Sequence, residues 1–98
     1  MSTYKVDYEL KSWPAFFGPI VAGQRTADIR NKADRDFRIG NVLRLREYDP
    51  WIGEYTGRHC VVKVTHVTSN VLPCALSSAV LHNDYAVLSL RLLSVGED

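Results

Sequence analysis

Guanidinium and ammonium groups, which bind anions, crowd into one stretch of this sequence. From Arg25 to Arg46 the chain holds seven basic residues and three acidic ones, although its formal net charge is only +1 over 98 residues. The basic residues are Arg25, Arg30, Lys32, Arg35, Arg38, Arg44 and Arg46. A guanidinium can donate two parallel hydrogen bonds to a phosphate. A local positive field favours an anionic partner, of which nucleic acid is the commonest large one.

Within this stretch, Asp28 and Arg30 are two residues apart on a predicted strand and therefore share one face, whereas Arg25 falls on the other. Arg30 either contacts a ligand or pairs with Asp28, and we favour ligand contact. Arg25 fits either role. Asp28 has no carboxylate or histidine partner close in sequence, so orienting an arginine or accepting a hydrogen bond from a base suits it better than acid catalysis.

Other candidate ligand-binding residues flank this strand. Lys32 and Arg35 belong to a mixed-charge loop, which is either solvated or part of the site. Arg44 and Arg46 alternate with Leu43 and Leu45, so they form either a basic strand face for a nucleic-acid backbone or a solvated flank. Tyr48 either hydrogen-bonds within the same cleft or has a structural role.

The elements that must position these residues begin with a strand over residues 4–11, where apolar and charged side chains alternate. The apolar spacing of residues 13–21 then predicts a short helix capped by Ser12 and ended by Gly23, with Pro19 kinking or shortening it. Trp13 and Phe16 could provide a stacking platform for a base. Their helical spacing instead predicts that they belong to the core with Phe17.

Further strands are predicted over residues 26–30, 42–48, 55–68 and 85–93, with a turn at 49–53 and a weak helical stretch at 75–81. Trp51 should be an exposed aromatic residue at the hairpin tip, or fold back onto Tyr55. We predict a single domain, residues 1–98, of the α+β class. Its strands would be mostly antiparallel and would form a small curled sheet or barrel with one or two short helices.

Composition excludes several classes of protein. With 46% hydrophobic and 23% charged residues the chain should fold, and no apolar run is long enough to cross a membrane, so we expect a cytoplasmic location. Cys60 and Cys74 suit buried thiols better than a disulfide scaffold, and no metal motif is present. Ser77, Ser78 and His82 lack the glycine pattern of a nucleophile elbow. We therefore expect neither a metal nor a cofactor.

Five short motifs follow one another along the first two thirds of the chain. They are Glu-Leu-Lys-x-Trp-Pro-x-Phe-Phe (9–17), Gly-x-Arg-Thr-x-Asp-x-Arg (23–30), Asp-Arg-Asp-Phe-x-x-Gly (34–40), Leu-Arg-Glu-Tyr-Asp (45–49) and Tyr-Thr-Gly-Arg (55–58). In this order they resemble a small ASCH-like domain family of the PUA superfamily, common in bacteria and phages. The resemblance implies a small PUA/ASCH-like β-barrel with a cleft beside the first helix, and a role in binding RNA.

The sequence departs from this family at several positions, and these differences affect which reaction the site could catalyse. Its signature Gly-x-Lys-x-x-Glu-x-Arg matches Gly23 and Arg30, but Arg25 replaces the lysine and Asp28 the glutamate. Tyr8 and Asn41 stand where relatives usually carry histidine and aspartate. Some ASCH-like proteins are amidohydrolases acting on N4-acetylcytidine, with a lysine and a threonine at the positions of Arg25 and Asp28. A guanidinium cannot lose its proton as a buried lysine can, so this chemistry is disfavoured here.

The leading expectation is therefore binding of RNA, or of a nucleotide or modified base, in a basic cleft beside the first helix. One alternative is a small nucleotide- or RNA-processing hydrolase that uses the same cleft. Another is a phage-type protein-interaction module that docks on a host protein through Trp51. The near-neutral total charge keeps that alternative open, because dedicated nucleic-acid binders are usually more basic.

Overall fold

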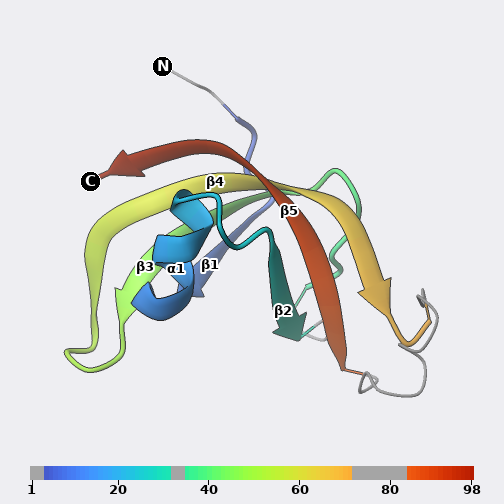
Figure 1. Ribbon diagram of the computed structural model, residues 1–98, viewed down its shortest axis with the longest axis horizontal. Helices are drawn as coiled ribbons and strands as arrows, with labels where there is room; N and C mark the ends of the chain where they lie inside the picture. The colour runs from blue at the N-terminus through green and yellow to red at the C-terminus, as the bar shows by residue number, and fades with distance from the viewer. Residues whose placement is uncertain (1–3, 32–34, 72–83) are drawn as a thin grey trace.

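A curled sheet wraps one short helix in the computed structural model, which describes residues 4–31, 35–71 and 84–98 (Figure 1). In chain order the elements are β1 (Tyr8–Ser12), α1 (Pro14–Val21), β2 (Ala27–Asn31), β3 (Val42–Asp49), β4 (Glu54–Ser69) and β5 (Tyr85–Glu97). This confirms the predicted small, strand-rich α+β architecture.

The sheet has the strand order β1-β3-β4-β5-β2, so β1 and β2 are its two edges among the described residues. β1 runs parallel to β3, and the other three pairings are antiparallel. The pairing of β4 with β5 shifts register twice, between Val61 and Val62 and between Val64 and His66. Such bulges bend and twist a strand, and β4 and β5 arch over α1 (Figure 1). The described residues thus form a curled half-barrel whose edges, β1 and β2, are not joined by a strand ladder.

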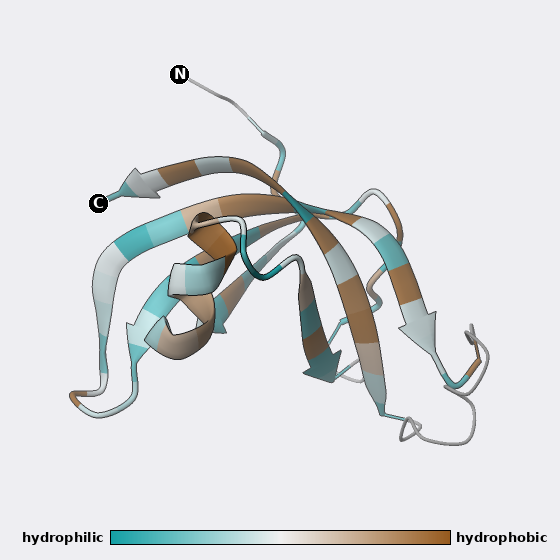
Figure 2. Cartoon of the chain, in the orientation of Figure 1, coloured by the Kyte–Doolittle hydropathy of each residue, from teal (hydrophilic) through white to brown (hydrophobic). Residues whose placement is uncertain are grey.

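The core fills the inside of this curl. Leu43 and Leu45 of β3 are buried and face α1, while Arg44 and Arg46 point outward, as the alternation predicted. The buried hydrophobic cluster is Phe17, Ile20, Phe37, Leu43, Leu45, Cys60, Val62, Val64, Val67, Ala86, Leu88 and Leu90. The middle of β4 is accordingly hydrophobic, whereas the end nearest the β3–β4 hairpin is not (Figure 2). The prediction that Cys60 is a buried free thiol is confirmed.

The start of α1 corrects two predictions. The N-cap residue is Trp13, with no side-chain cap, whereas Ser12 is a buried β1 residue paired with Glu47 of β3. Phe17 is fully buried, but Trp13 is 52% exposed and Phe16 43% exposed, so their assignment to the core was wrong. A helix of only eight residues presents a narrow stripe to the sheet, and Phe17 and Ile20 occupy it.

Other differences concern boundaries. Tyr4 to Val6 precede the first strand, which begins at Tyr8, although the Asp7 amide still donates to the Val42 carbonyl at 2.8 Å. β5 extends to Glu97, beyond the predicted end at residue 93. Trp51 at the hairpin tip is 94% exposed, so it does not fold back onto Tyr55. The predicted helical stretch at 75–81, with Cys74, Ser77, Ser78 and His82, lies outside the described residues.

Candidate functional site

The end of α1 delivers Arg25 to the candidate site. Gly23 has φ of 76°, a left-handed conformation that side chains other than glycine rarely adopt. The Gly23 amide donates to the Ile20 carbonyl at 3.1 Å and the Gln24 amide to the Pro19 carbonyl at 2.9 Å, which together make a Schellman motif. The Arg25 amide also donates to the Pro19 carbonyl, at 3.1 Å. Arg25 is therefore held at the helix exit, directly before β2.

The register of β2 turns its charged side chains toward the inside of the curl. Asp28 lies opposite Leu88 and Arg30 opposite Ala86, and both partners are buried core residues. Residues directly opposite one another in a sheet project to the same face. The prediction that Asp28 and Arg30 share a face is thus confirmed, and that face is the interior side of the sheet edge.

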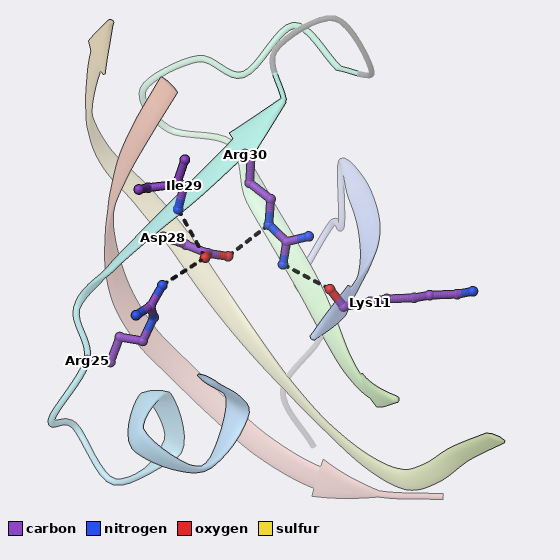
Figure 3. A network of polar contacts seen from close by, with 5 residues as sticks. All are labelled: Lys11, Arg25, Asp28, Ile29 and Arg30. Atoms are coloured by element: carbon purple, nitrogen blue, oxygen red, sulfur yellow. Dashed lines mark hydrogen bonds and ion pairs between the residues drawn. The ribbon is translucent and has the colours of Figure 1, made fainter. Parts of the chain in front are cut away.

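Asp28 binds the two arginines with its two carboxylate oxygens (Figure 3). Oδ2 accepts from Nε of Arg30 at 2.8 Å, and Oδ1 accepts from Nη2 of Arg25 at 3.2 Å and from the amide of Ile29 at 3.0 Å. The Asp28 side chain is only 12% exposed. This confirms that Asp28 orients arginine, and it gives the cluster a net charge of +1.

Arg30 also connects the two edges of the sheet. Its Nη2 donates to the main-chain carbonyl oxygen of Lys11 in β1 at 2.9 Å, whereas the Lys11 side chain points away from the cluster (Figure 3). A single guanidinium thus links Asp28 on β2 to the backbone of β1 where no ladder joins these strands. The sequence favoured ligand contact for Arg30 over pairing with Asp28; the structure shows that the pair forms, and ligand contact stays a prediction.

A cleft of about 230 Å³ opens between these edges, beside α1. We call it the edge cleft; it is lined by Lys11, Ser12, Trp13, Phe16, Asp28, Ile29 and Arg30. The guanidinium of Arg25 lies 5.0 Å from the ring centroid of Phe16, which fixes one aromatic wall next to the charged cluster. The cleft therefore combines oriented hydrogen-bond donors with two half-exposed aromatic rings.

Not all predicted site residues reach this cleft. Arg44, Arg46 and Tyr48 belong to β3, and the two arginines project from the outer face of the sheet. Arg44 is ion-paired with Glu9 at 2.9 Å. Arg35 lies 5.6 Å from the ring centroid of Tyr8 and lines a neighbouring cavity with Arg30 and Arg46. Lys32 lies outside the described residues.

Sequence reasoning missed four residues near these cavities. Trp13 and Phe16 were assigned to the core, and Lys11 and Tyr55 were not considered as site residues. The hairpin register could have identified Tyr55, because a turn at 49–53 places Tyr48 directly opposite it. Lys11 could not have been found without knowing that β1 pairs in parallel with β3.

A second polar pair lies on the inner face of β3, where Glu47 is buried and the side chain of its partner Arg58 is 43% exposed. Glu47 is 3% exposed and accepts two hydrogen bonds from Arg58, at 2.9 Å from Nε and 2.8 Å from Nη2, and one from the Thr56 hydroxyl at 2.7 Å. Hydrogen bonding by Arg58 holds the pKa of Glu47 below its ordinary value, against the opposing effect of burial. The Arg58 guanidinium lies 5.1 Å from the Phe17 ring centroid. The pair thus contacts α1 through Phe17, and neither Glu47 nor Arg58 is among the residues that line the edge cleft.

The described residues were compared with the patterns of metal-binding clusters and membrane-spanning helices. No group of three or more histidine, cysteine or acidic side chains gathers there in a way that could hold a metal ion. None of the helices in that part of the chain is long and apolar enough to cross a bilayer.

The comparison with known protein families covers most of the chain. No curated protein matches it. The family described as a domain of unknown function, DUF3850, matches residues 7–90, a range that includes β1, β2 and the whole edge cleft. The match exceeds half of the sequence, and the chain therefore belongs to the DUF3850 family.

Proposed function

We propose that this protein is a cytoplasmic ASCH/PUA-like domain that binds RNA, or a nucleotide or modified base, in the edge cleft. The observation that carries the proposal is the geometry around Asp28, whose carboxylate orients Arg25 and Arg30 beside exposed aromatic rings. The motifs that resemble the ASCH-like family include these same residues and support the assignment.

The chemistry of the cleft suits one nucleobase or nucleoside. A flat aromatic ring such as Trp13 or Phe16 can stack on an unpaired base, which contributes roughly 1–3 kcal/mol per base. Guanidinium groups donate to base carbonyls and to phosphate oxygens. The cleft volume of about 230 Å³ lies below the roughly 300–1,000 Å³ of pockets for drug-sized ligands. We therefore propose recognition of a single base that is not held in a duplex.

Binding is favoured over catalysis because Asp28 is poorly placed to act as an acid or base. Its oxygens already accept three hydrogen bonds, and among the described residues neither a second carboxylate nor a histidine lines the edge cleft. General acid–base catalysis needs a group free to reach the transferred proton. The alternative hydrolase on this cleft predicts turnover of RNA or nucleosides that Asp28→Asn abolishes. Intact substrates after prolonged incubation with the wild-type protein would remove that alternative.

One observation favours a protein-interaction role as a second candidate. Trp51 and Ile52 at the β3–β4 hairpin are 94% and 65% exposed, and exposed tryptophan is common at the centres of protein interfaces. A host protein captured by the wild type but not by Trp51→Ala would support this role. Capture that is unaffected by Trp51→Ala would exclude docking through the hairpin.

Tryptophan fluorescence can test the edge cleft directly, because the chain has only two tryptophans and only Trp13 lines the cleft. In a Trp51→Phe background, a nucleoside that enters the cleft should quench the remaining emission. We expect saturable quenching by ribonucleosides and its loss in Arg30→Ala. Arg38→Ala is the matched control, since Arg38 forms an exposed ion pair with Asp36 away from the cleft.

Anisotropy measurements extend this test to macromolecules. Labelled single-stranded RNA, duplex RNA, transfer RNA and DNA would be titrated at two salt concentrations. We expect single-stranded RNA to bind best and Arg30→Ala to weaken its binding far more than Arg38→Ala or Arg91→Ala. Equal losses from all three variants, or no quenching by any nucleoside, would reject the edge cleft as the site.

A further inference from the structure

Two cations on the outer face of the sheet stand directly opposite each other on neighbouring strands. Lys11 of β1 pairs in register with Arg46 of β3. One step further along, Tyr48 of β3 lies directly opposite Tyr55 of β4, with ring centroids 5.1 Å apart at an angle of 71°. We call Lys11, Arg46, Tyr48 and Tyr55 the outer-face cluster.

The tyrosine rings hold both cations in place. The Lys11 ammonium lies 4.3 Å from the Tyr48 ring centroid, and the Arg46 guanidinium lies 3.9 Å from the Tyr55 ring centroid. These distances are within the range of cation–π attraction. Stacking fixes the two charged groups on one side of the sheet without neutralising them.

Like charges directly opposite each other in a sheet are destabilising. The other outward-facing arginine of β3 avoids this cost, because Arg44 is ion-paired with Glu9 at 2.9 Å. Among the described residues no carboxylate lies within ion-pair distance of Lys11 or Arg46. The outer-face cluster therefore keeps a doubly positive site that the fold itself does not need, which is the arrangement expected for binding an external anion.

This cluster adjoins the edge cleft through a second cavity. That cavity measures about 430 Å³ and is lined by Glu9, Leu10, Lys11, Arg30, Arg35, Arg46 and Tyr55. Lys11 and Arg30 line both the edge cleft and this cavity. Of the described residues in the lining, Glu9 alone carries a carboxylate, and that carboxylate is engaged by Arg44. The edge cleft and this cavity therefore meet at Lys11 and Arg30.

We infer that the outer-face cluster binds the phosphodiester backbone of single-stranded nucleic acid that extends from a base held in the edge cleft. The inference rests on the proposed function, because a base held in the edge cleft determines where the rest of the nucleic-acid strand lies. An ammonium and a guanidinium fixed side by side match adjacent phosphate oxygens, and the partly exposed ring of Tyr55 offers a stacking surface for a neighbouring base. A duplex would keep its bases away from both surfaces.

The test uses Lys11→Gln and Arg46→Gln, which remove charge but retain length, with Arg44→Gln as the matched control on the same strand face. A labelled pool of single-stranded RNA of about 8 nucleotides, within the usual site size of such proteins, would be titrated at about 50 and 200 mM salt. Each of the two variants should weaken binding roughly threefold to tenfold at the lower salt. Each should also reduce the slope of log affinity against log salt by about 0.7, the value for one phosphate contact on a single strand. Arg44→Gln should change neither quantity.

Several outcomes separate this inference from the function on which it rests. Equal effects of Arg44→Gln and Arg46→Gln, or unchanged salt slopes in all variants, would overturn the outer-face site. An absence of RNA binding would also overturn the outer-face site, even if nucleosides still quench Trp13. Tighter binding of polyglutamate than of RNA would overturn it as well. A different result would support the outer-face site and reject the edge cleft. In that case RNA binding would require Lys11 and Arg46 but would be unchanged in Arg30→Ala, and nucleosides would not quench Trp13. Circular dichroism of each variant confirms that the fold is retained.

Discussion

The Arg30 side chain donates to the Lys11 main-chain carbonyl at 2.9 Å, and this one bond spans the gap between the two edge strands of the sheet. The same guanidinium is held by Asp28 at 2.8 Å. Arg30 therefore has a structural role in closing the curl and, in our proposal, a binding role in the edge cleft. Experiments on this residue must separate the two.

Replacement of Arg30 by alanine should lower the free energy of unfolding by about 1–3 kcal/mol, because two charge-assisted hydrogen bonds of a partly buried group are lost. Arg38→Ala should change stability by less than about 0.5 kcal/mol, since both partners of its ion pair are exposed. Urea denaturation of both variants measures the difference. Arg30→Lys keeps the charge but loses the planar fork, so it should recover little of the loss. Full recovery of stability by lysine would show that the directed bonds to Asp28 and Lys11 are unimportant.

Truncation of the two neighbouring phenylalanines of α1 should affect different properties, stability for Phe17 and ligand binding for Phe16. Phe17 is fully buried, and Phe17→Ala should cost about 3–5 kcal/mol of stability. Phe16 is 43% exposed beside the edge cleft, so Phe16→Ala should cost much less but should weaken quenching of Trp13 by nucleosides. Thermal denaturation and nucleoside titration of the two variants provide the comparison. Similar destabilisation by both substitutions would place Phe16 in the core after all.

Much of this fold follows from local pattern. The alternation of Leu43 and Leu45 with Arg44 and Arg46 is a period-two signal, and it predicted both β3 and its buried face. The turn residues at 49–53 predicted the β3–β4 hairpin in the same way. These features depend on residues that are close in sequence, so the sequence alone was sufficient.

The candidate site depends on contacts that no local pattern contains. Arg30 reaches the Lys11 backbone only because β1 and β2 end up at opposite edges of a curled sheet, an arrangement set by the long pairing of β4 with β5. The exposure of Trp13 and Phe16 has a similar origin. Their spacing is that of a buried stripe, but the short helix leaves room against the sheet only for Phe17 and Ile20.

Burial should make the Cys60 thiol unreactive at neutral pH. Removal from water raises its pKa to about 11 from an ordinary value of 9.0, so the reactive thiolate is scarce in the folded protein. In a Cys74→Ser background, labelling by a thiol reagent should therefore be slow in buffer and rapid in denaturant. Fast labelling of the folded protein would mean that β4 opens locally.

The same shift predicts a loss of stability in alkali. The pKa of the Cys60 thiol is 9.0 in the unfolded chain and about 11 in the folded protein. The thiol therefore contributes fully to stability below pH 9.0, and this contribution disappears as the pH rises towards about 11. Tyrosines and lysines titrate in this range too, so the comparison must be with a variant. Between pH 9 and 11, Cys60→Ala should lose less stability than the wild type. Parallel losses in the two proteins would show that Cys60 does not contribute to alkaline unfolding.

Glu47 should make the protein sensitive to acid. Because Arg58 lowers the pKa of Glu47 below its ordinary value of 4.5 in the folded state, the pair stabilises the fold above that value. The contribution is then lost as the pH falls below 4.5 towards the folded pKa. Glu47→Gln should therefore be less stable than the wild type at pH 7 and should show a shallower decline on acidification.

The matched control for this experiment is Glu9→Gln, because Glu9 also pairs with an arginine but its side chain is half exposed. Its ion pair with Arg44 is screened by water, so the variant should follow the wild-type pH dependence closely. Urea denaturation between pH 3 and 7 gives the required free energies. If Glu9→Gln made the loss of stability in acid as shallow as Glu47→Gln does, general charge repulsion rather than the Glu47–Arg58 pair would control acid unfolding.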